Sequence, residues 1–141
     1  MKVKLLACLS VLVLTACEPP PPPAERSPVM LAALTGDVSR GRQLYADECQ
    51  HCHQLQRGKN TKGPQLLRIY GAKAAGLADY SRYSAALKQS GWIWDAATLD
   101  RYLEHPDKAL PNTKMLYDGL PDTSDRQALI AYLSTLRVEK I

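Results

Sequence analysis

Five consecutive residues, Cys49-Gln50-His51-Cys52-His53, constrain this chain more than any other part of its sequence. Two thiols three positions apart, followed at once by an imidazole, form the Cys-x-x-Cys-His pattern of covalent haem attachment. The thiols meet the two vinyl groups of one porphyrin, and the adjacent His53 lies under the ring to give a nitrogen to the iron. A thiol–disulfide pair and half of a zinc site are the competing interpretations.

Neither competing interpretation fits the rest of the chain. Thioredoxin-like chemistry expects a βαβ setting, which the sequence lacks. A zinc site needs further soft ligands, and the two other cysteines are Cys8, in an N-terminal export segment, and Cys17, directly after it. We therefore predict one haem c, covalently attached through Cys49 and Cys52.

Length and composition agree with a haem domain. The chain has 141 residues and no Phe, so its core must be built from Leu, Ala, seven Tyr and two Trp. That length fits one domain with a tail rather than a two-domain enzyme. A large rigid prosthetic group supplies the missing bulk.

The first 16 residues have the form of an export signal. Lys2 and Lys4 precede an apolar run at 5–16, which is too short to cross a bilayer as a helix. Residues 14–17, Leu-Thr-Ala-Cys, resemble the lipobox of bacterial lipoproteins, where the peptide is cut before a cysteine that then carries lipid. We expect lipidation of Cys17; ordinary cleavage that leaves a free Cys17 is the alternative.

The expected organisation is therefore a signal peptide at 1–16, a Pro-rich tether at 17–36 and a haem domain at 37–141. Five consecutive prolines in the tether adopt polyproline II and span about 15 Å. Several acyl chains on one cysteine would keep the mature protein on a bacterial membrane, facing the periplasm.

Removal of the signal changes the charge balance. The chain has 18 basic and 14 acidic side chains, and the loss of Lys2 and Lys4 lowers its formal charge from +4 to +2. Haem propionates would bring that value close to neutral. The sequence therefore gives little support to a nucleic-acid partner.

From residue 37 onward the chain reads as helices and loops, because no stretch alternates with period two. Asp37 or Ser39 can cap a helix that runs to about residue 48, and Ser81 or Ser84 can open a short helix. We expect an all-α fold of four to five helices, with long loops at 54–80 and 106–122. Loops that long need something to pack against, and a haem provides it.

The later helices have clearer ends. Gly91 ends the short helix, Asp95 caps a helix from 96 to about 104, and Pro106 ends that one. A capping box from Ser124 to Gln127 is expected to begin the last helix. Its apolar residues follow at spacings of three and four, which gives one buried face.

A low-spin haem needs a second axial ligand opposite His53. Met1 lies in the signal and Met30 in the tether, which leaves Met115, in a loop that Pro111 stiffens. His105 is the rival ligand, and a Met that only fills the core is the other alternative. We expect Met115 to bind the iron.

The chain also resembles the class I cytochromes c, in their mitochondrial and bacterial small-cytochrome branch, from about residue 36 to residue 136. The motifs that carry this resemblance are Gly41-x-x-x-Tyr45, Cys49-x-x-Cys52-His53, Lys62-Gly63-Pro64-x-Leu66, Tyr83-Ser84, Gly91-x-x-Trp94, Leu99-x-x-Tyr102-Leu103-x-x-Pro106, Pro111-x-Thr113-Lys114-Met115 and Asp125-Arg126-x-x-Leu129-Ile130-Ala131-Tyr132-Leu133.

The resemblance implies roles for several of these residues. Gly41 would let the first helix cross the last, and the Pro64 carbonyl would accept the second ring N–H of His53. The remaining roles concern the haem edge and the sulfur: Tyr83 and Trp94 would bond the inner propionate, Thr113 the outer propionate, and Tyr102 would touch the Met115 sulfur. The alternative for Tyr83, Trp94 and Tyr102 is that each is only an aromatic residue of the core.

Three positions depart from the family pattern. Ala72 stands where the family usually has an Arg that supports a propionate, and Arg68 and Asn112 each replace a Gly. Lys73 and Arg68 are the candidates to compensate for Ala72.

These features predict a membrane-tethered carrier of single electrons and not an enzyme. We expect a monomer whose donor and acceptor are membrane or periplasmic oxidoreductases. The alternatives are a haem sensor or peroxide-reducing enzyme with a labile Met115, and a dedicated haem subunit of a dehydrogenase. The expected docking face is mixed in sign, with acidic Glu48, Asp107 and Asp122 among basic Lys59, Lys62, Lys108 and Lys114.

Overall fold

The structure, a computed structural model, describes residues 35–136. The expected signal peptide, the Cys17 lipidation site and nearly all of the tether lie outside the described residues. Between residues 35 and 136, no helix combines the length and the apolar character that crossing a membrane requires.

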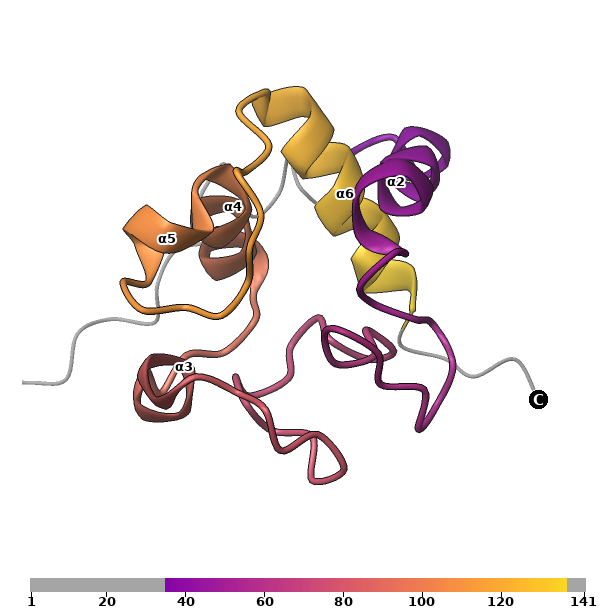
Figure 1. Ribbon diagram of the computed structural model, residues 1–141. Coiled ribbons are helices and arrows are strands. Elements are labelled where there is room, and N and C mark those ends of the chain that lie inside the picture. Colours follow the sequence, from indigo (N-terminus) through magenta and orange to yellow (C-terminus); the bar gives the residue numbers. More distant parts are fainter. Residues whose placement is uncertain (1–34, 137–141) are drawn as a thin grey trace, which may run out of the picture.

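The described residues form five α-helices and one π-helical turn, which confirms the all-α class. The elements are α2 (Val38–Leu44), η1 (Tyr45–Cys49), α3 (Ala85–Gln89), α4 (Ala96–Glu104), α5 (Pro106–Ala109) and α6 (Thr123–Thr135). Between 35 and 136, the only β-type pairing consists of two isolated bridges, His53 with Asn60 and Lys73 with Ile93. Long loops therefore connect the helices, as expected (Figure 1).

Helices α2 and α6 cross at the top right of Figure 1, and this crossing depends on Gly41. A Cβ atom built on Gly41 would collide with the backbone carbonyl of Ala128 and would lie 2.8 Å from the Cβ of Tyr132. Real Cβ atoms do not approach that closely, so only glycine allows this separation of the two backbones. The expected role of Gly41 is confirmed.

Helix α6 is the centre of the core. Leu129 and Ile130 are 1% and 0% exposed, and α4 packs beside α6 through buried Leu99 and Leu103. Each such aliphatic side chain contributes about 1.5–3 kcal/mol when it leaves water. These two helices, with α2, form the rigid frame from which the irregular segments extend.

Side-chain caps begin most of the helices. Asp37 accepts from the backbone N–H groups of Ser39 and Arg40, and Asp95 accepts from Thr98 at 2.8 Å. Ser84, not Ser81, caps α3 by accepting from Leu87 at 3.1 Å. These bonds satisfy N–H groups that have no partner within the helix.

The start of α6 differs from the expected capping box. Asp122 is the cap, since its carboxylate accepts from the backbone N–H of Asp125 at 2.9 Å. The Ser124 hydroxyl donates to the same carboxylate oxygen at 2.6 Å, so Ser124 supports the cap instead of forming it. The helix therefore begins at Thr123.

Pro106 has two roles, only one of which was expected. It ends α4, because a proline has no N–H to continue the ladder. Its fixed φ also suits the first position of a helix, and the short α5 begins at Pro106. The segment 106–122 therefore contains a helical turn at its start and is not loop throughout.

Candidate functional site

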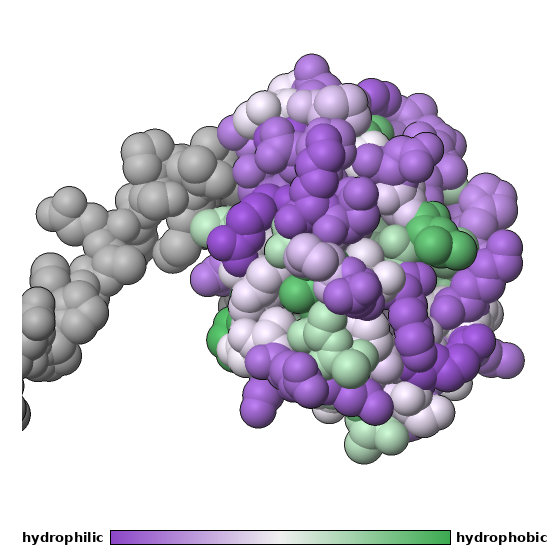
Figure 2. Space-filling model, turned by 60° about the vertical axis from the view of Figure 1, so that its left-hand side comes forward, coloured by the Kyte–Doolittle hydropathy of each residue, from purple (hydrophilic) through white to green (hydrophobic). Residues whose placement is uncertain are grey.

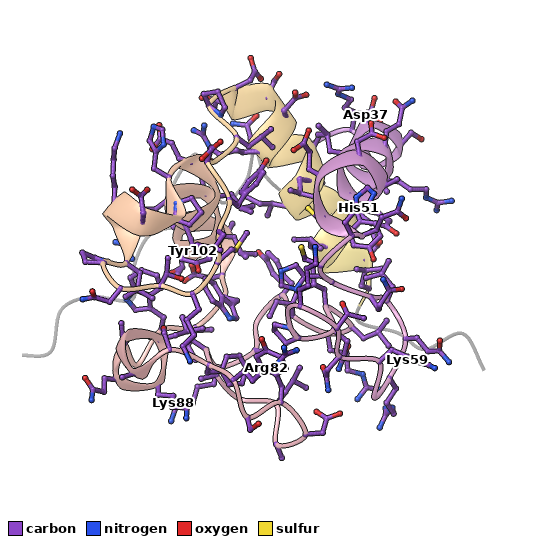
Figure 3. The ribbon with its side chains drawn as sticks, viewed as in Figure 1. Asp37, His51, Lys59, Arg82, Lys88 and Tyr102 are labelled. Carbon is purple, nitrogen blue, oxygen red and sulfur yellow. The ribbon has the colours of Figure 1, made fainter. Side chains whose placement is uncertain are left out.

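One cavity of about 640 Å³ lies below the frame of α2, α4 and α6. Helices line only part of it, and the connecting segments line the rest, above all those between η1 and α3 and between α5 and α6 (Figure 3). All nine predicted cofactor-binding residues line this cavity: Cys49, Cys52, His53, Pro64, Tyr83, Trp94, Tyr102, Thr113 and Met115. Residues separated by up to 66 positions are thus brought to one site.

The two cysteines lie at the end of the helix that begins at Val38. The last turn of this helix widens into η1, and the chain then folds back tightly, with the N–H groups of Cys52 and His53 donating to the Cys49 carbonyl at 3.0 and 2.9 Å. This turn brings both thiols to the cavity wall. Burial is the main cause that raises the pKa of the Cys49 thiol to about 12, so the thiol stays protonated. Both cysteines are free thiols.

His53 is held in one tautomer. Its Nδ1 lies 2.7 Å from the Pro64 carbonyl oxygen, and because a carbonyl only accepts, Nδ1 must carry the hydrogen. Nε2 therefore keeps its lone pair in the neutral ring. Burial lowers the pKa of His53, with an opposing effect of the Pro64 bond, so the ring is neutral near pH 7. A neutral imidazole of this kind is a strong iron ligand.

Gly63 and Tyr45 complete the surroundings of His53. A Cβ atom on Gly63 would collide with the imidazole, 2.6 Å from Nδ1, so a side chain there would displace the ring. The Tyr45 hydroxyl donates to the His53 carbonyl at 2.6 Å. The ring and the backbone of His53 are thus both fixed.

Met115 lies on the same cavity, on the loop that follows α5. It is half-buried, and its backbone N–H donates to the Thr113 hydroxyl oxygen at 3.3 Å. That hydroxyl also pairs with the Tyr102 hydroxyl at 2.6 Å, which ties the loop to α4. The expected contact of Tyr102 with the Met115 sulfur stays a prediction.

His105, the rival ligand, is not among the described residues that line the cavity. It joins α4 to α5, and its Nδ1 faces the Asp118 carbonyl oxygen at 3.3 Å. This position favours Met115.

Aromatic rings form one wall. The Trp94 and Tyr102 ring centroids lie 5.1 Å apart, and Trp92 meets both rings edge-on at 6.0 and 6.2 Å. Tyr83 also lines the cavity and is half-buried, and burial raises its pKa. A flat apolar group suits such a wall.

The charges around the cavity fit a haem. Five basic side chains line it against a single acidic one, Glu48; the basic residues are Lys62, Arg68, Lys73, Arg82 and Lys114. A cavity with apolar and aromatic walls, two thiols, a neutral imidazole and excess positive charge suits a porphyrin that has two carboxylates. The residues present therefore fit the predicted cofactor.

Both replacements of family glycines lie in the left-handed backbone region. Arg68 has φ of 58° and Asn112 has φ of 65°. Asn tolerates this region well, whereas Arg68 costs about 1 kcal/mol there. At both positions where the family has a glycine, this chain therefore adopts the positive φ that glycine favours, although the residue is Arg68 or Asn112.

Sequence reasoning missed three contributors to the site. From the sequence, Tyr45 is only a member of a family motif, and neither Arg82 nor the ring of Tyr80 has a predicted role. A guanidinium next to Tyr83, in a loop expected to meet the haem edge, was the available signal for Arg82.

Comparison with known proteins agrees with this geometry. The family model described as cytochrome c matches residues 38–137. The chain is 42% identical over 102 residues to cytochrome c of Arabidopsis thaliana, covering 72% of this chain and 90% of that protein. It is 40% identical over 106 residues to cytochrome c2 of Rhodopila globiformis, covering 75% of this chain and 99% of that protein.

The chain belongs to the cytochrome c family.

A solved structure extends the likeness to three dimensions. Cytochrome cH from Methylobacterium extorquens shares 42% identity and a TM-score of 0.66, covering 71% of this chain and 99% of that chain. As a cytochrome c, the protein carries electrons on one haem c attached through Cys49 and Cys52, and it is not an enzyme.

Proposed function

We propose that this cytochrome is a membrane-tethered carrier of single electrons, with His53 and Met115 as the axial ligands of its iron. The observation that carries the proposal is the fixed tautomer of His53. Its Nδ1 is bound to Pro64, so Nε2 offers a lone pair to the cavity that Met115 also lines. A nitrogen and a thioether ligand together favour a raised reduction potential.

The residues of the chain keep this geometry the same in both oxidation states. When bound, the haem supplies an iron that alternates between ferrous and ferric. Pro64 and Tyr45 hold His53, while Thr113 holds the backbone of Met115. With both axial positions filled, reorganisation on electron transfer is small and no position is left for a substrate.

The polar residues of the aromatic wall have a further proposed role. Tyr83 and Trp94 would donate to the inner propionate and Thr113 to the outer one. The Thr113 oxygen accepts from the Met115 N–H and pairs with Tyr102. Burying a neutral polar group without a hydrogen-bond partner costs about 2–7 kcal/mol, and burying a carboxylate without a partner costs more.

Electron exchange would take place at the open side of the cavity. Leu116, next to Met115, lines the cavity and is 99% exposed. The face shown in Figure 2 is mostly hydrophilic, with hydrophobic residues in small separate groups. Such a surface suits brief contacts rather than permanent assembly, which agrees with a monomer.

The proposed location is the periplasmic side of a bacterial membrane. Residues 1–16 would direct export, lipid on Cys17 would anchor the protein, and the tether would hold the haem domain near its partners. These partners are membrane or periplasmic oxidoreductases that give and take single electrons. Tethering raises their effective concentration without any new contact.

Two measurements test this function. Redox titration of the purified haem protein should follow a reversible one-electron curve, and the ferrous form should not bind carbon monoxide readily. Rapid and complete binding of carbon monoxide at neutral pH would contradict a carrier and favour a ligand sensor.

The anchor needs a separate test in cells. Cys17→Ser should release soluble cytochrome that retains its haem, whereas Cys8→Ser, the matched control, should leave it on the membrane. A Cys17→Ser protein that stays as tightly bound as the unchanged chain would overturn lipid anchoring at this residue.

A further inference from the structure

The side of the cavity that lies away from α6 carries a guanidinium. Arg82 lines the cavity, and Figure 3 shows it at the bottom of the molecule, far from the crossing of α2 and α6. Cys49 ends η1, and the attachment turn that follows it carries Cys52, whereas Arg82 comes from the segment just before α3. Tyr83 and Ser84, the next residues along the chain, line the cavity with Arg82.

Two contacts orient Arg82. Its Nη2 donates to the backbone carbonyl of Thr61, and its guanidinium lies 5.3 Å from the ring centroid of Tyr80. The Tyr80 hydroxyl in turn donates to the Lys62 carbonyl at 3.0 Å. These bonds join the segment before Gly63 to the segment before Tyr83, and they leave other guanidinium N–H groups free to donate elsewhere.

The propionates of haem c require a positively charged partner. The two thioether bonds of this haem form at one edge of the porphyrin, and its two propionates project from the opposite edge. If Tyr83 and Trp94 bond the inner propionate as proposed above, the carboxylates would lie on the side of the cavity that Arg82, next to Tyr83 in the chain, also lines. A carboxylate removed from water needs a counter-charge as well as hydrogen bonds, and Ala72 provides neither.

The two other candidates are less well placed. Arg68 also borders a second pocket, which Asp79 lines too, so its side chain is not committed to the haem cavity. Lys73, which is exposed as Arg82 is, has a single ammonium instead of a planar fork. Arg82 combines a place on the cavity wall with a fixed orientation.

We infer that Arg82 supplies the cation that pairs with the haem propionates, in the place that Ala72 leaves vacant. The inference rests on the haem site and ligation proposed above. Arg82 thereby neutralises the carboxylates and joins the haem edge to the loop that carries Gly63 and Pro64.

This pairing has two consequences for the electrochemistry. A cation near the iron favours the ferrous state, so loss of Arg82 should lower the reduction potential. The same cation lowers the propionate pKa, so its loss should move the pH-dependent step of the potential to higher pH. The charged and titratable groups that share the cavity are Glu48, His53, Lys62, Arg68, Lys73, Tyr80, Tyr83 and Lys114.

The experiment compares the reduction potential of the haem protein and its variants from acid to mildly alkaline pH. Arg82→Gln should lower the potential and move its pH-dependent step upward, while Arg82→Lys should give a smaller change in the same direction. Arg68→Gln is the control with the same loss of charge, and it should change both quantities much less. Tyr80→Phe tests the scaffold: it keeps the ring next to Arg82, so it should lower the stability of the protein and move the potential far less than Arg82→Gln does.

An Arg82→Gln protein whose potential matches the unchanged chain at every pH would overturn the inference. Equal effects of Arg68→Gln and Arg82→Gln would also overturn it, because total charge would then explain both. If Arg82→Gln fails to fold, the comparison of Arg82→Lys with Arg68→Gln decides in the same way. The far-red absorption band of a Met sulfur–iron bond, recorded on every sample, tests the ligation separately.

Discussion

The hydroxyl of Tyr45 donates a hydrogen bond of 2.6 Å to the backbone carbonyl of His53. Tyr45 lies at the start of η1 and is 7% exposed. Its hydrogen bond therefore reaches across the attachment turn to His53, the last residue of the haem-attachment motif. Its ring also packs on Tyr132 of α6, with centroids 5.8 Å apart. The His53 backbone is thereby connected to the helical frame.

Replacing Tyr45 with Phe should therefore weaken the fold while sparing ligation. The ring contact with Tyr132 survives, but the His53 carbonyl loses its donor, which should cost about 1 kcal/mol. The check is denaturant unfolding of the haem protein together with its visible spectrum. A variant as stable as the unchanged chain would show that this bond contributes nothing.

The crossing of α2 and α6 gives a second prediction. Gly41→Ala places a methyl group against the Ala128 carbonyl, and overpacking of this kind costs about 1–3 kcal/mol or more. The measurement is the free energy of unfolding. Gln43→Ala is the control, since Gln43 is exposed on the same helix and should change stability by less than about 0.5 kcal/mol. Similar values for the two variants would contradict the close crossing.

The cap of α6 gives a prediction on pH. Hydrogen bonds from the Ser124 hydroxyl and from the Asp125 backbone hold the pKa of the Asp122 carboxyl below its usual value. As the pH falls, the Asp122 carboxylate takes up a proton in the unfolded chain before it does so in the folded protein. It therefore stabilises the fold fully above its unfolded pKa of about 3.9. That contribution is lost as the pH falls through the lower, folded pKa.

Ser124→Ala removes the largest cause of this shift, so its stability deficit should shrink as the solution becomes acidic. The measurement is the free energy of unfolding across a series of pH values. Asp122→Asn, which keeps a capping oxygen but cannot titrate, should lose this pH dependence. Parallel curves for all three proteins would contradict the prediction.

How far the sequence predicts this molecule depends on the range of the interactions. Asp95 and Pro106 bound α4 as expected, because a cap and a proline act within a few residues. The cap of α6 was misplaced, since Asp122 and Ser124 are both good capping residues and only the structure shows that one supports the other.

The site divides in the same way. The attachment motif is local, so the sequence predicts Cys49, Cys52 and His53 directly. Ligation by Met115 is a prediction reached by eliminating the other methionines. The Tyr45 and Arg82 contacts were not predicted, because they join segments that have no periodic pattern. Their geometry exists only once the loops have folded around the cavity.

The charges of the docking face expected from the sequence predict a weak effect of salt. Lys59 and Lys114 are exposed, but so are Glu48 and Asp107, so the expected docking face carries both signs although the cavity lining itself is mostly basic. Salt screens charges beyond a Debye length of about 8–10 Å. Because a face with both signs gives little electrostatic steering, salt should reduce the association rate only slightly. The second-order rate of electron transfer from the anchor-free protein to its native partner should fall only mildly with ionic strength. A steep fall would mean that one sign is clustered at the docking surface.

The ferric spectrum of Met115→Ala tests the central claim most directly. The haem protein should show the weak far-red band of a Met sulfur–iron bond. Met115→Ala should abolish that band and lower the reduction potential, because the thioether ligand is lost. His105→Ala should leave both unchanged, since His105 does not line the cavity. Survival of the band in Met115→Ala, or its loss in His105→Ala, would contradict the ligation on which this account depends.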